Sequence, residues 1–285
     1  MEKKHISSDL DQTKVLLIND ISGYSKISLG VMIPIMSHMG FGVNNLPTAV
    51  VSNTLDYGKF EILETTEYMK GTLNVWKELG FTFDAICTGM IFSEEQVKVV
   101  SEYCHEQRAK GVRIFVDPIM GDNGALYNGV SDETVRYMRK ICSVADIIMP
   151  NFTEAAFLAD KHFDKRAVTL EEAKELVDEL RNLGSKSVVI TSITVDGQTC
   201  VYGYDDEQDD YFNIPFDYIP VHIPGTGDIF SALLVGSVLK GRDLQVSTAY
   251  AMKTLRELIM LNKDNADKTS GIPIELYLEE MTNFE

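Results

Sequence analysis

Residues 223–241 read IPGTGDIFSALLVGSVLKG, which places two glycines and an aspartate at the start of an apolar, helical pattern. Gly225, Thr226 and Gly227 would present backbone N–H groups at the head of this helix, where the dipole carries roughly half a positive charge. Such a group of donors binds anions. Asp228 follows directly and could simply cap the helix, a role worth about 1 kcal/mol. An N-cap explains neither glycine, whereas close approach of a phosphate to bare backbone explains both.

If the anion is a phosphoryl group in transit, Asp228 has a second role. A carboxylate within reach of a substrate hydroxyl orients that hydroxyl and accepts its proton while the new O–P bond forms. The sequence therefore predicts an anion hole at Gly225–Gly227 with Asp228 as the base. Two other phosphate motifs are missing: Gly58-Lys59 lacks the rest of a P-loop, and the glycines at 225 and 227 lack the third glycine of a dinucleotide fingerprint.

Short strands rich in Val and Ile alternate with amphipathic helices, which predicts an α/β fold whose mainly parallel sheet is covered on both faces. The expected strands are 15–19, 47–52, 84–89, 113–118, 146–151 and 187–192, and the expected helices are 28–39, 60–79, 93–109, 131–143, 170–183, 228–240, 243–262 and 272–281. Between 198 and 216 a hairpin is expected, with the acidic run DDEQDD as a solvated tip that could instead bind a cation. No repeat or composition break appears, so we expect one domain over residues 1–285.

Six consecutive expected strands end in polar residues. In a doubly wound sheet, ligands bind at the carboxyl ends of the strands. Turn chemistry alone accounts for some of these residues, but six ends in a row favour a shared cleft. The polar ends are Asn19 and Asp20; Ser52, Asn53 and Thr54; Thr88 and Gly89; Asp117; Asn151; and Thr191 and Ser192.

The composition excludes several classes of partner. Among 285 residues, 26 Lys and Arg oppose 43 Asp and Glu, so the formal net charge of −17 repels nucleic acids and anionic membranes. The four cysteines lie far apart, without a CxxC pair or a metal-ligand spacing, and we expect them to be reduced and mostly buried. The sequence shows neither a signal peptide nor a run of about 18 apolar residues, so we expect a cytoplasmic protein.

Several segments, in this order, resemble the ribokinase-like superfamily and, within it, the vitamin B6 kinases that phosphorylate pyridoxal, pyridoxine and pyridoxamine. They are INDISGYSKIS near the start, LPTAVVSNTLDYGKF at 46–60, VDPIMGD at 116–122, MPNFTE at 149–154, VITS at 189–192 and GTGD at 225–228. The resemblance covers nearly the whole chain. It implies a three-layer α/β/α sandwich that forms a homodimer. It also implies that the protein binds ATP, Mg²⁺ and a small-molecule substrate, and it leaves open a requirement for K⁺.

The resemblance also implies roles for single residues. Asp228 matches the base that activates the substrate hydroxymethyl group, and Gly225 to Gly227 match the anion hole. Each residue on the nucleotide side has a local explanation as well, such as a turn, a strand end or the helix dipole, but the set matches the family in order. For nucleotide and metal, the implied residues are Asp117, Asp122, Tyr127, Asn151, Glu154, Thr191 and Ser192, with Asp117 and Glu154 nearest the metal and Asn151 and Glu154 acting largely through water.

The residues implied for the substrate ring depart from the better-known pyridoxal kinases. Those enzymes carry SNHTxY and TGY, whereas this chain reads SNTLDY and TGM, and its NDISG brings Asp20 where many have serine. Asp20 is similar to the aspartate in the TDPSGG start of hydroxymethylpyrimidine kinases, and a carboxylate there would favour an amine such as pyridoxamine. A hydroxymethylpyrimidine kinase and a non-catalytic vitamer-binding protein are the alternatives. The expected substrate residues are Asp20, Ser22, Ser52, Thr54 and Met90.

Overall fold

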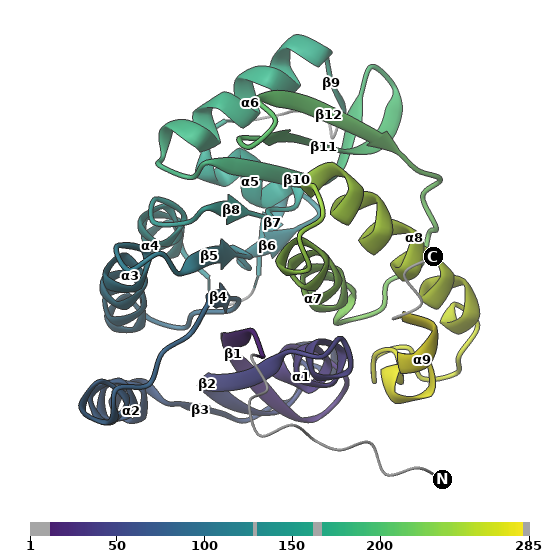
Figure 1. The fold of residues 1–285 in the computed structure, drawn as a ribbon. Helices are drawn as coiled ribbons and strands as arrows, with labels where there is room; N and C mark the ends of the chain where they lie inside the picture. The colour runs from purple at the N-terminus through teal and green to yellow at the C-terminus, as the bar shows by residue number, and fades with distance from the viewer. Residues whose placement is uncertain (1–11, 128–129, 162–166, 282–285) are drawn as a thin grey trace, which may run out of the picture.

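The computed structural model describes residues 12–127, 130–161 and 167–281. They form a three-layer sandwich in which one large sheet lies between two layers of helices (Figure 1). The strand order in the sheet is β12-β11-β10-β8-β5-β4-β1-β2-β3, and β9 pairs with β10. The strands from β2 through β1, β4, β5 and β8 to β10 are parallel, while β3, β11 and β12 join the two edges of the sheet through antiparallel pairs. The predicted fold class, an α/β sandwich with a mainly parallel sheet, is therefore confirmed. The strands are β1 (Lys14–Tyr24), β2 (Gly42–Asn53), β3 (Ile62–Glu64), β4 (Ala85–Thr88), β5 (Arg113–Val116), β8 (Ile147–Ile148), β9 (Ala167–Val168), β10 (Ser187–Val195), β11 (Gln198–Asp205) and β12 (Asp210–Pro215).

The central strands are apolar on both faces because helices cover both sides of the sheet. Leu16 and Ile18 of β1 pack into one core, and Val15 and Leu17 pack into the other. Figure 1 shows α2, α3 and α4 on one side and α1, α7 and α8 on the opposite side. The helices are α1 (Leu29–His38), α2 (Thr66–Leu79), α3 (Glu94–Arg108), α4 (Asp132–Cys142), α5 (Phe152–Leu158), α6 (Leu170–Asn182), α7 (Thr226–Leu239), α8 (Leu244–Asn262) and α9 (Leu278–Met281), with 3-10 turns η1 (Leu55–Tyr57) and η2 (Ile274–Leu276).

Helix α7 is the central helix of its layer. Every residue from Asp228 to Val238 is buried, which is typical of a helix that is apolar all round. It packs against α8 and α1 and beneath the sheet, so its first turn cannot shift without disturbing the core. Its head therefore has a fixed position at the carboxyl ends of the strands.

Several predicted elements differ from the observed ones. The expected helix 60–79 begins only at Thr66, because residues 62–64 pair with β2 as the edge strand β3. Helix α5 was not among the expected helix ranges, although the helix-dipole explanation of Glu154 implies a helix start there, and Asn151 and Glu154 form a capping box. Strand β1 runs five residues beyond its expected end, β2 begins five residues before its expected start, and the expected last helix is divided between η2 and α9. The hairpin of β11 and β12 is confirmed, with residues 206–210 exposed at its tip.

Other features of the core agree with the sequence. Cys87, Cys104, Cys142 and Cys200 are buried free thiols, as predicted. Within the described ranges, none of the helices combines the length and apolar character that crossing a bilayer requires.

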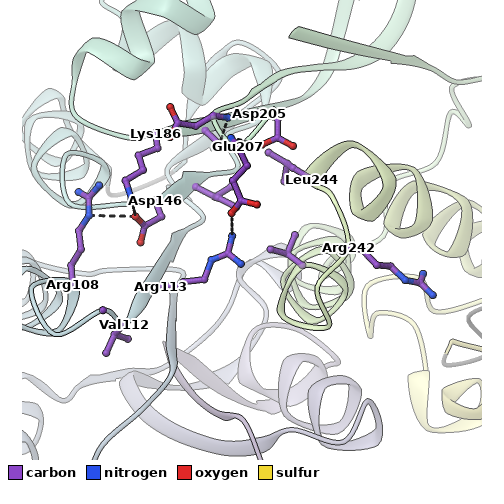
Figure 2. A pocket seen from close by; sticks show the side chains of 14 residues that line it. Arg108, Val112, Arg113, Asp146, Lys186, Asp205, Glu207, Arg242 and Leu244 are labelled. Carbon is purple, nitrogen blue, oxygen red and sulfur yellow. Dashed lines mark hydrogen bonds and ion pairs between the residues drawn. The ribbon is translucent and has the colours of Figure 1, made fainter. Parts of the chain in front are cut away.

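A cavity of about 220 Å³ lies at the amino ends of β5, β8 and β10, opposite to the strand ends that carry the expected site. Figure 2 shows ion pairs among several of its charged side chains. Asp146 accepts Lys186 at 2.9 Å and Arg108 at 3.4 Å, and Arg113 meets Glu207 at 3.2 Å. These ion pairs join the hairpin tip and the starts of the strands, so we assign the cavity a structural role.

The two ends of α7 offer a matched test of this packing. Gly225 begins the helix with φ 82°, and a Cβ there would lie 2.4 Å from the Lys26 carbonyl oxygen. Gly241 follows the helix with φ 84°, and a Cβ there would meet nothing within 4 Å. We expect Gly225→Ala to lower the free energy of unfolding by about 2–4 kcal/mol, since it adds a clash to the backbone penalty, and Gly241→Ala by only about 1–2 kcal/mol. Urea unfolding of both variants measures the difference, and equal losses would contradict the packing described.

Candidate active site

Asp228 lies inside the first turn of α7. Gly225 is the N-cap, and the N–H of Ile229 donates to the Gly225 carbonyl at 3.0 Å. Asp228 is therefore the third residue of the helix, and the capping role considered for it is wrong. Its side chain is buried, with 8% of the residue exposed. The helix dipole places partial positive charge beside it.

Two donors from the start of the chain hold the Asp228 carboxylate. The N–H of Ser28 donates to Oδ2 at 2.8 Å, and Nδ2 of Asn19 donates to Oδ1 at 3.1 Å. The pKa of Asp228 is raised to about 7, chiefly by burial and also by the charges of Asp20 and Asp117, against the two hydrogen bonds, which lower it. A carboxyl group with a pKa near the operating pH is suited to accept a proton from a substrate.

Asn19 joins three parts of the site, and it is absent from the predicted site residues. Besides its bond to Asp228, its Oδ1 accepts the N–H of Met90 at 2.8 Å and the N–H of Asp20 at 2.9 Å. A Cβ at Gly89 would lie 2.4 Å from Asn19 Cγ, so the close approach of this side chain requires glycine. The signal in the sequence was a polar residue at the end of an apolar strand, but its type alone did not reveal these partners.

Asp20 lies at an irregularity of β1. The register with β2 pairs Asn19 with Pro47 and then Ile21 with Val50, so β2 gains a residue there. Such bulges redirect side chains and are common beside active sites. Asp20 is buried, and burial raises the pKa of its carboxyl group, whereas a hydrogen bond from the Ser28 side chain lowers it. The charge of Asp20 acts on Asp228 and raises its pKa, so the two carboxylates lie within electrostatic range of each other.

Of the other predicted substrate residues, Met90 and Thr54 lie near this group, whereas Ser22 and Ser52 bond to local partners. Met90 joins this group, since Asn19 binds its N–H and the Thr48 hydroxyl donates to its carbonyl at 2.9 Å. Thr54 is buried, and its N–H donates to Oγ of Ser25 at 3.4 Å. Ser25 lies three residues before Ser28. Ser22 and Ser52 have local partners instead. The Ser22 hydroxyl donates to the Tyr24 carbonyl at 2.9 Å, and that of Ser52 donates to Asn53 at 2.7 Å.

The glycine turn has two separate explanations. Gly225 is required by its positive φ and by the Lys26 carbonyl, independently of any ligand. At Gly227, in contrast, a Cβ would meet nothing within 4 Å, so its backbone borders open space. The Thr226 hydroxyl donates back to the Ile223 carbonyl at 3.1 Å. The expectation that phosphate approach explains both glycines is therefore corrected: only Gly227 has no packing reason.

A second pair of carboxylates lies beyond α7. Asp117 follows β5, and its Oδ2 accepts the Ser231 hydroxyl at 2.7 Å from α7, one turn after Asp228. Glu154 of α5 accepts the N–H of Met120 at 3.0 Å and that of Asn151 at 2.9 Å. Burial raises the pKa of Asp117 to about 6, and burial together with the charge of Asp117 raises the pKa of Glu154 well above its usual range. Ser231 was missed because it stands within an apolar helical pattern.

Asn151 connects the predicted nucleotide residues. As N-cap of α5, it accepts the N–H of Glu154 at 3.0 Å, and its Nδ2 donates to the Gly121 carbonyl at 2.8 Å. It also bridges to Thr191, whose N–H donates to the Pro150 carbonyl at 2.9 Å. Ser192 is exposed at a bulge of β10 with φ 57°.

Asp122 ends β6 (Gly121–Asp122), and Tyr127 follows its partner strand β7 (Ala125–Leu126). The Asp122 side chain accepts the N–H of Asn123 at 2.6 Å, as the turn explanation predicts. The N–H of Tyr127 donates to the Met120 carbonyl at 3.0 Å. Burial and the charges of Glu154, Asp122 and Asp117 raise the pKa of the Tyr127 phenol, so it stays protonated beside them.

These carboxylates suit a hard cation in part. Oxygen donors are the ligands of Mg²⁺, which usually keeps several waters and binds one or two carboxylates together with substrate phosphates. Within the described ranges, no three His, Cys, Asp or Glu side chains gather closely enough to hold a metal ion by themselves. Both oxygens of Glu154 already accept N–H bonds, which favours contact through water. The donor set therefore fits a metal shared with a phosphate ligand.

Comparison with known proteins identifies the same segments. A family model described as phosphomethylpyrimidine kinase matches residues 34–272. Pyridoxal kinase of Arabidopsis thaliana is 31% identical over 202 residues, which cover 68% of this chain and 63% of the relative. A protein of Bacteroides thetaiotaomicron, provisionally named a phosphomethylpyrimidine kinase and crystallised with pyridoxal, has a TM-score of 0.89 at 37% identity and covers 95% of this chain and 96% of its own. Pyridoxal kinase of Lactobacillus plantarum has a TM-score of 0.83 at 25% identity, covering 94% and 96%.

The linking role of Asn19 can be tested by measuring the free energy of unfolding of a variant. Asn19→Ala removes one donor to Asp228 and leaves the N–H groups of Asp20 and Met90 without their acceptor, so we expect a loss of about 2–4 kcal/mol in the free energy of unfolding. Asn44→Ala is the control, because Asn44 is half-buried and, among the residues that the structure describes, its side chain bonds just the nearby Gly42 carbonyl. Urea unfolding at pH 8 compares the two. A loss no larger than that of the control would contradict the linking role.

Proposed function

This chain belongs to the phosphomethylpyrimidine kinase family, and we propose that it transfers the terminal phosphoryl group of ATP to the 5′-hydroxymethyl group of a vitamin B6 vitamer. The observation that carries this proposal is the buried Asp228 carboxylate at the head of α7, beside backbone that borders open space at Gly227. The similarity to the Bacteroides protein crystallised with pyridoxal supports the substrate class. Pyridoxal 5′-phosphate salvage is the role that this reaction would serve.

Each group at the site has a task in this reaction. Asp228 accepts the proton of the hydroxymethyl group while its oxygen attacks the phosphorus, and a pKa of about 7 makes this transfer feasible near neutral pH. Asn19 and Ser28 fix the orientation of the carboxylate through their two hydrogen bonds. The N–H groups of residues 226–228 precede the first hydrogen bond of α7, so they are available to stabilise charge that develops on the phosphoryl oxygens.

On the nucleotide side, we propose that Asp117 and Glu154 hold Mg²⁺, Glu154 through water, while Asn151 keeps Glu154 in place. The ion would neutralise phosphate charge that the acidic protein otherwise repels. Ser231 fixes Asp117 from α7. Asp122, Tyr127, Thr191 and Ser192 are proposed to border the nucleotide, and a dependence on K⁺ is open to the same assay.

For the ring, we propose contacts from Asp20, Met90 and Thr54, and Asp20 favours pyridoxamine among the vitamers. Ser22 and Ser52, whose hydroxyls have local partners, would act through their strands. A hydroxymethylpyrimidine kinase is the second candidate, because the matched family model is described as phosphomethylpyrimidine kinase and Asp20 suits an exocyclic amine. A single-domain homodimer in the cytoplasm remains a proposal that rests on the family resemblance and the reduced cysteines.

One assay tests the proposal and the role of the base together. ADP release is measured with pyridoxal, pyridoxine, pyridoxamine and hydroxymethylpyrimidine as acceptors. We expect turnover of the vitamers, and we expect Asp228→Asn to lower kcat by about 10²–10⁴-fold, because a positioned general base contributes that much. Vitamer binding, followed by calorimetry, should be retained. Asp217→Asn, which removes the same charge from an exposed loop position before α7, is the matched control and should behave as the wild type.

The other outcomes separate the alternatives. A strong preference for hydroxymethylpyrimidine would replace the proposed substrate. Vitamer binding without ADP release from the wild-type protein would favour a non-catalytic vitamer-binding protein. Full activity of Asp228→Asn would contradict the role of Asp228 as the general base.

A further inference from the structure

The segment 89–93 joins β4 to α3 at the carboxyl end of β4 and has no regular secondary structure. Both backbone groups of its second residue, Met90, are hydrogen-bonded to side chains of other strands. The N–H donates to Oδ1 of Asn19 in β1 at 2.8 Å, and the carbonyl accepts the hydroxyl of Thr48 in β2 at 2.9 Å. Because both backbone groups are engaged, a ligand beside the half-buried Met90 would meet its side chain.

Thr48 donates this hydrogen bond from an irregular part of β2. It lies where the β1–β2 register shifts after Asn19, and there β2 has two residues, 48 and 49, opposite one residue of β1. A bulge of this kind redirects side chains from the regular alternation of a strand. Thr48 is 0% exposed. A hydroxyl buried so completely costs free energy unless it is hydrogen-bonded, so its bond to the segment after β4 is the reason that the position can be polar.

Gln96 holds the same segment from the first turn of α3, and it is also 0% exposed. Its Nε2 donates to the Thr48 carbonyl at 2.7 Å, and its Oε1 accepts the N–H of Phe92 at 3.1 Å. One side chain therefore joins the end of the segment to the residue that binds Met90. Buried amides are found where their donors and acceptors have partners, and this glutamine has one on each side.

We propose that Thr48 and Gln96 are positioning residues for the acceptor substrate, because together they fix the backbone of 89–93 so that Met90 packs beside the substrate ring. This inference rests on the proposed function, which places Met90 at the ring. Neither residue contacts the substrate in this account. Both act through the segment, and the hydroxyl of Thr48 is the group whose removal changes the position of Met90 most directly.

Asn19 connects this segment to the proposed base. Its Nδ2 donates to Asp228 Oδ1 at 3.1 Å, while its Oδ1 accepts the Met90 N–H. Thr48 binds the other backbone group of Met90, so the segment is held between β1 and β2 beside the base. The proposed nucleotide residues stand on other elements, namely the ends of β5 and β10, helix α5 and the β6–β7 hairpin. Loss of the Thr48 hydroxyl should therefore weaken binding of the acceptor and leave binding of the nucleotide unchanged.

The test compares Thr48→Val, which removes the hydroxyl and keeps the shape of the side chain, with Thr48→Ser, which keeps the hydroxyl. With pyridoxal as acceptor, we expect Thr48→Val to raise KM, and the dissociation constant measured by calorimetry, about fivefold, as the loss of one neutral hydrogen bond implies. KM for ATP should stay within about twofold of wild type. Thr48→Ser should have the wild-type values for pyridoxal.

Thr248→Val is the matched control. The Thr248 hydroxyl is also 0% exposed and donates to a backbone carbonyl, that of Leu244, at 2.8 Å, but it lies on α8. This variant loses the same kind of buried hydrogen bond, so it reports the general cost of such a loss. Its KM values for pyridoxal and ATP should equal those of the wild type.

A double-mutant cycle shows whether Thr48 acts through Met90. Met90→Ala alone should weaken pyridoxal binding, since apolar contact with the ring is lost. In the Met90→Ala background, Thr48→Val should add less than about 1.5-fold, instead of the fivefold expected in the wild-type background, because residues that act as one unit are not additive. Gln96→Met keeps the length of the side chain and loses both hydrogen bonds, and it should also raise the KM for pyridoxal.

Four results would overturn the inference. They are an unchanged affinity of Thr48→Val for pyridoxal, an equal rise of KM for ATP and pyridoxal, the same defect in Thr248→Val, and full additivity with Met90→Ala. If Thr48→Val does not fold, Gln96→Met and its cycle with Met90→Ala decide the question.

Failure of the proposed function has a different signature. If the wild-type protein phosphorylates hydroxymethylpyrimidine and no vitamer, the proposed substrate is wrong, and the same comparisons with hydroxymethylpyrimidine decide the role of Thr48. If the wild-type protein binds none of these acceptors, the proposed function and this inference both fail.

Discussion

The site depends on one constraint: a carboxylate is buried at the head of a buried helix, and its hydrogen bonds come from the other end of the chain. Asp228 cannot turn toward water, so Asn19 and the Ser28 N–H must be brought to it. This requirement agrees with the irregular β1–β2 register after Asn19 and with the strained residue, Ser28, in the turn before α1. The central position of α7 and the parallel strands then keep these donors in register with the base.

A second consequence concerns charge. The chain carries a formal net charge of −17. Four carboxyl groups with raised pKa values lie near the carboxyl ends of its parallel strands, and they are those of Asp20, Asp117, Glu154 and Asp228. Such a cluster repels a nucleotide unless local positive charge intervenes. The head of α7 supplies fixed partial charge from backbone N–H groups, and a divalent cation between carboxylates and phosphates would supply the remainder. Their mutual repulsion thus prepares the site for a cation and for proton transfer.

The sequence was informative where residue type reports directly on structure. Apolar strands, amphipathic helices and polar strand ends predicted the sheet and the edge that carries the site, and the GTGD turn predicted the place of Asp228. Contacts between distant segments were not predictable, because nothing in the sequence shows that Asn19 reaches Asp228 or that the Lys26 carbonyl dictates Gly225. Ser28 and Ser231 were missed since a serine at a helix start or within an apolar helix has ordinary explanations.

The most direct test of the central claim is the protonation state of Asp228 itself. Its carboxyl stretching band can be followed by infrared difference spectroscopy across pH, with Asp228→Asn subtracted. Burial raises its pKa from 3.8 to about 7, so the folded protein binds this proton more tightly than the unfolded chain, and this group reduces stability as pH rises from about 4 to about 7. We expect a protonated band that disappears with a midpoint near pH 7. A midpoint near the ordinary value of 3.8 would contradict it, because the carboxylate would then be neither buried nor poised to accept a proton.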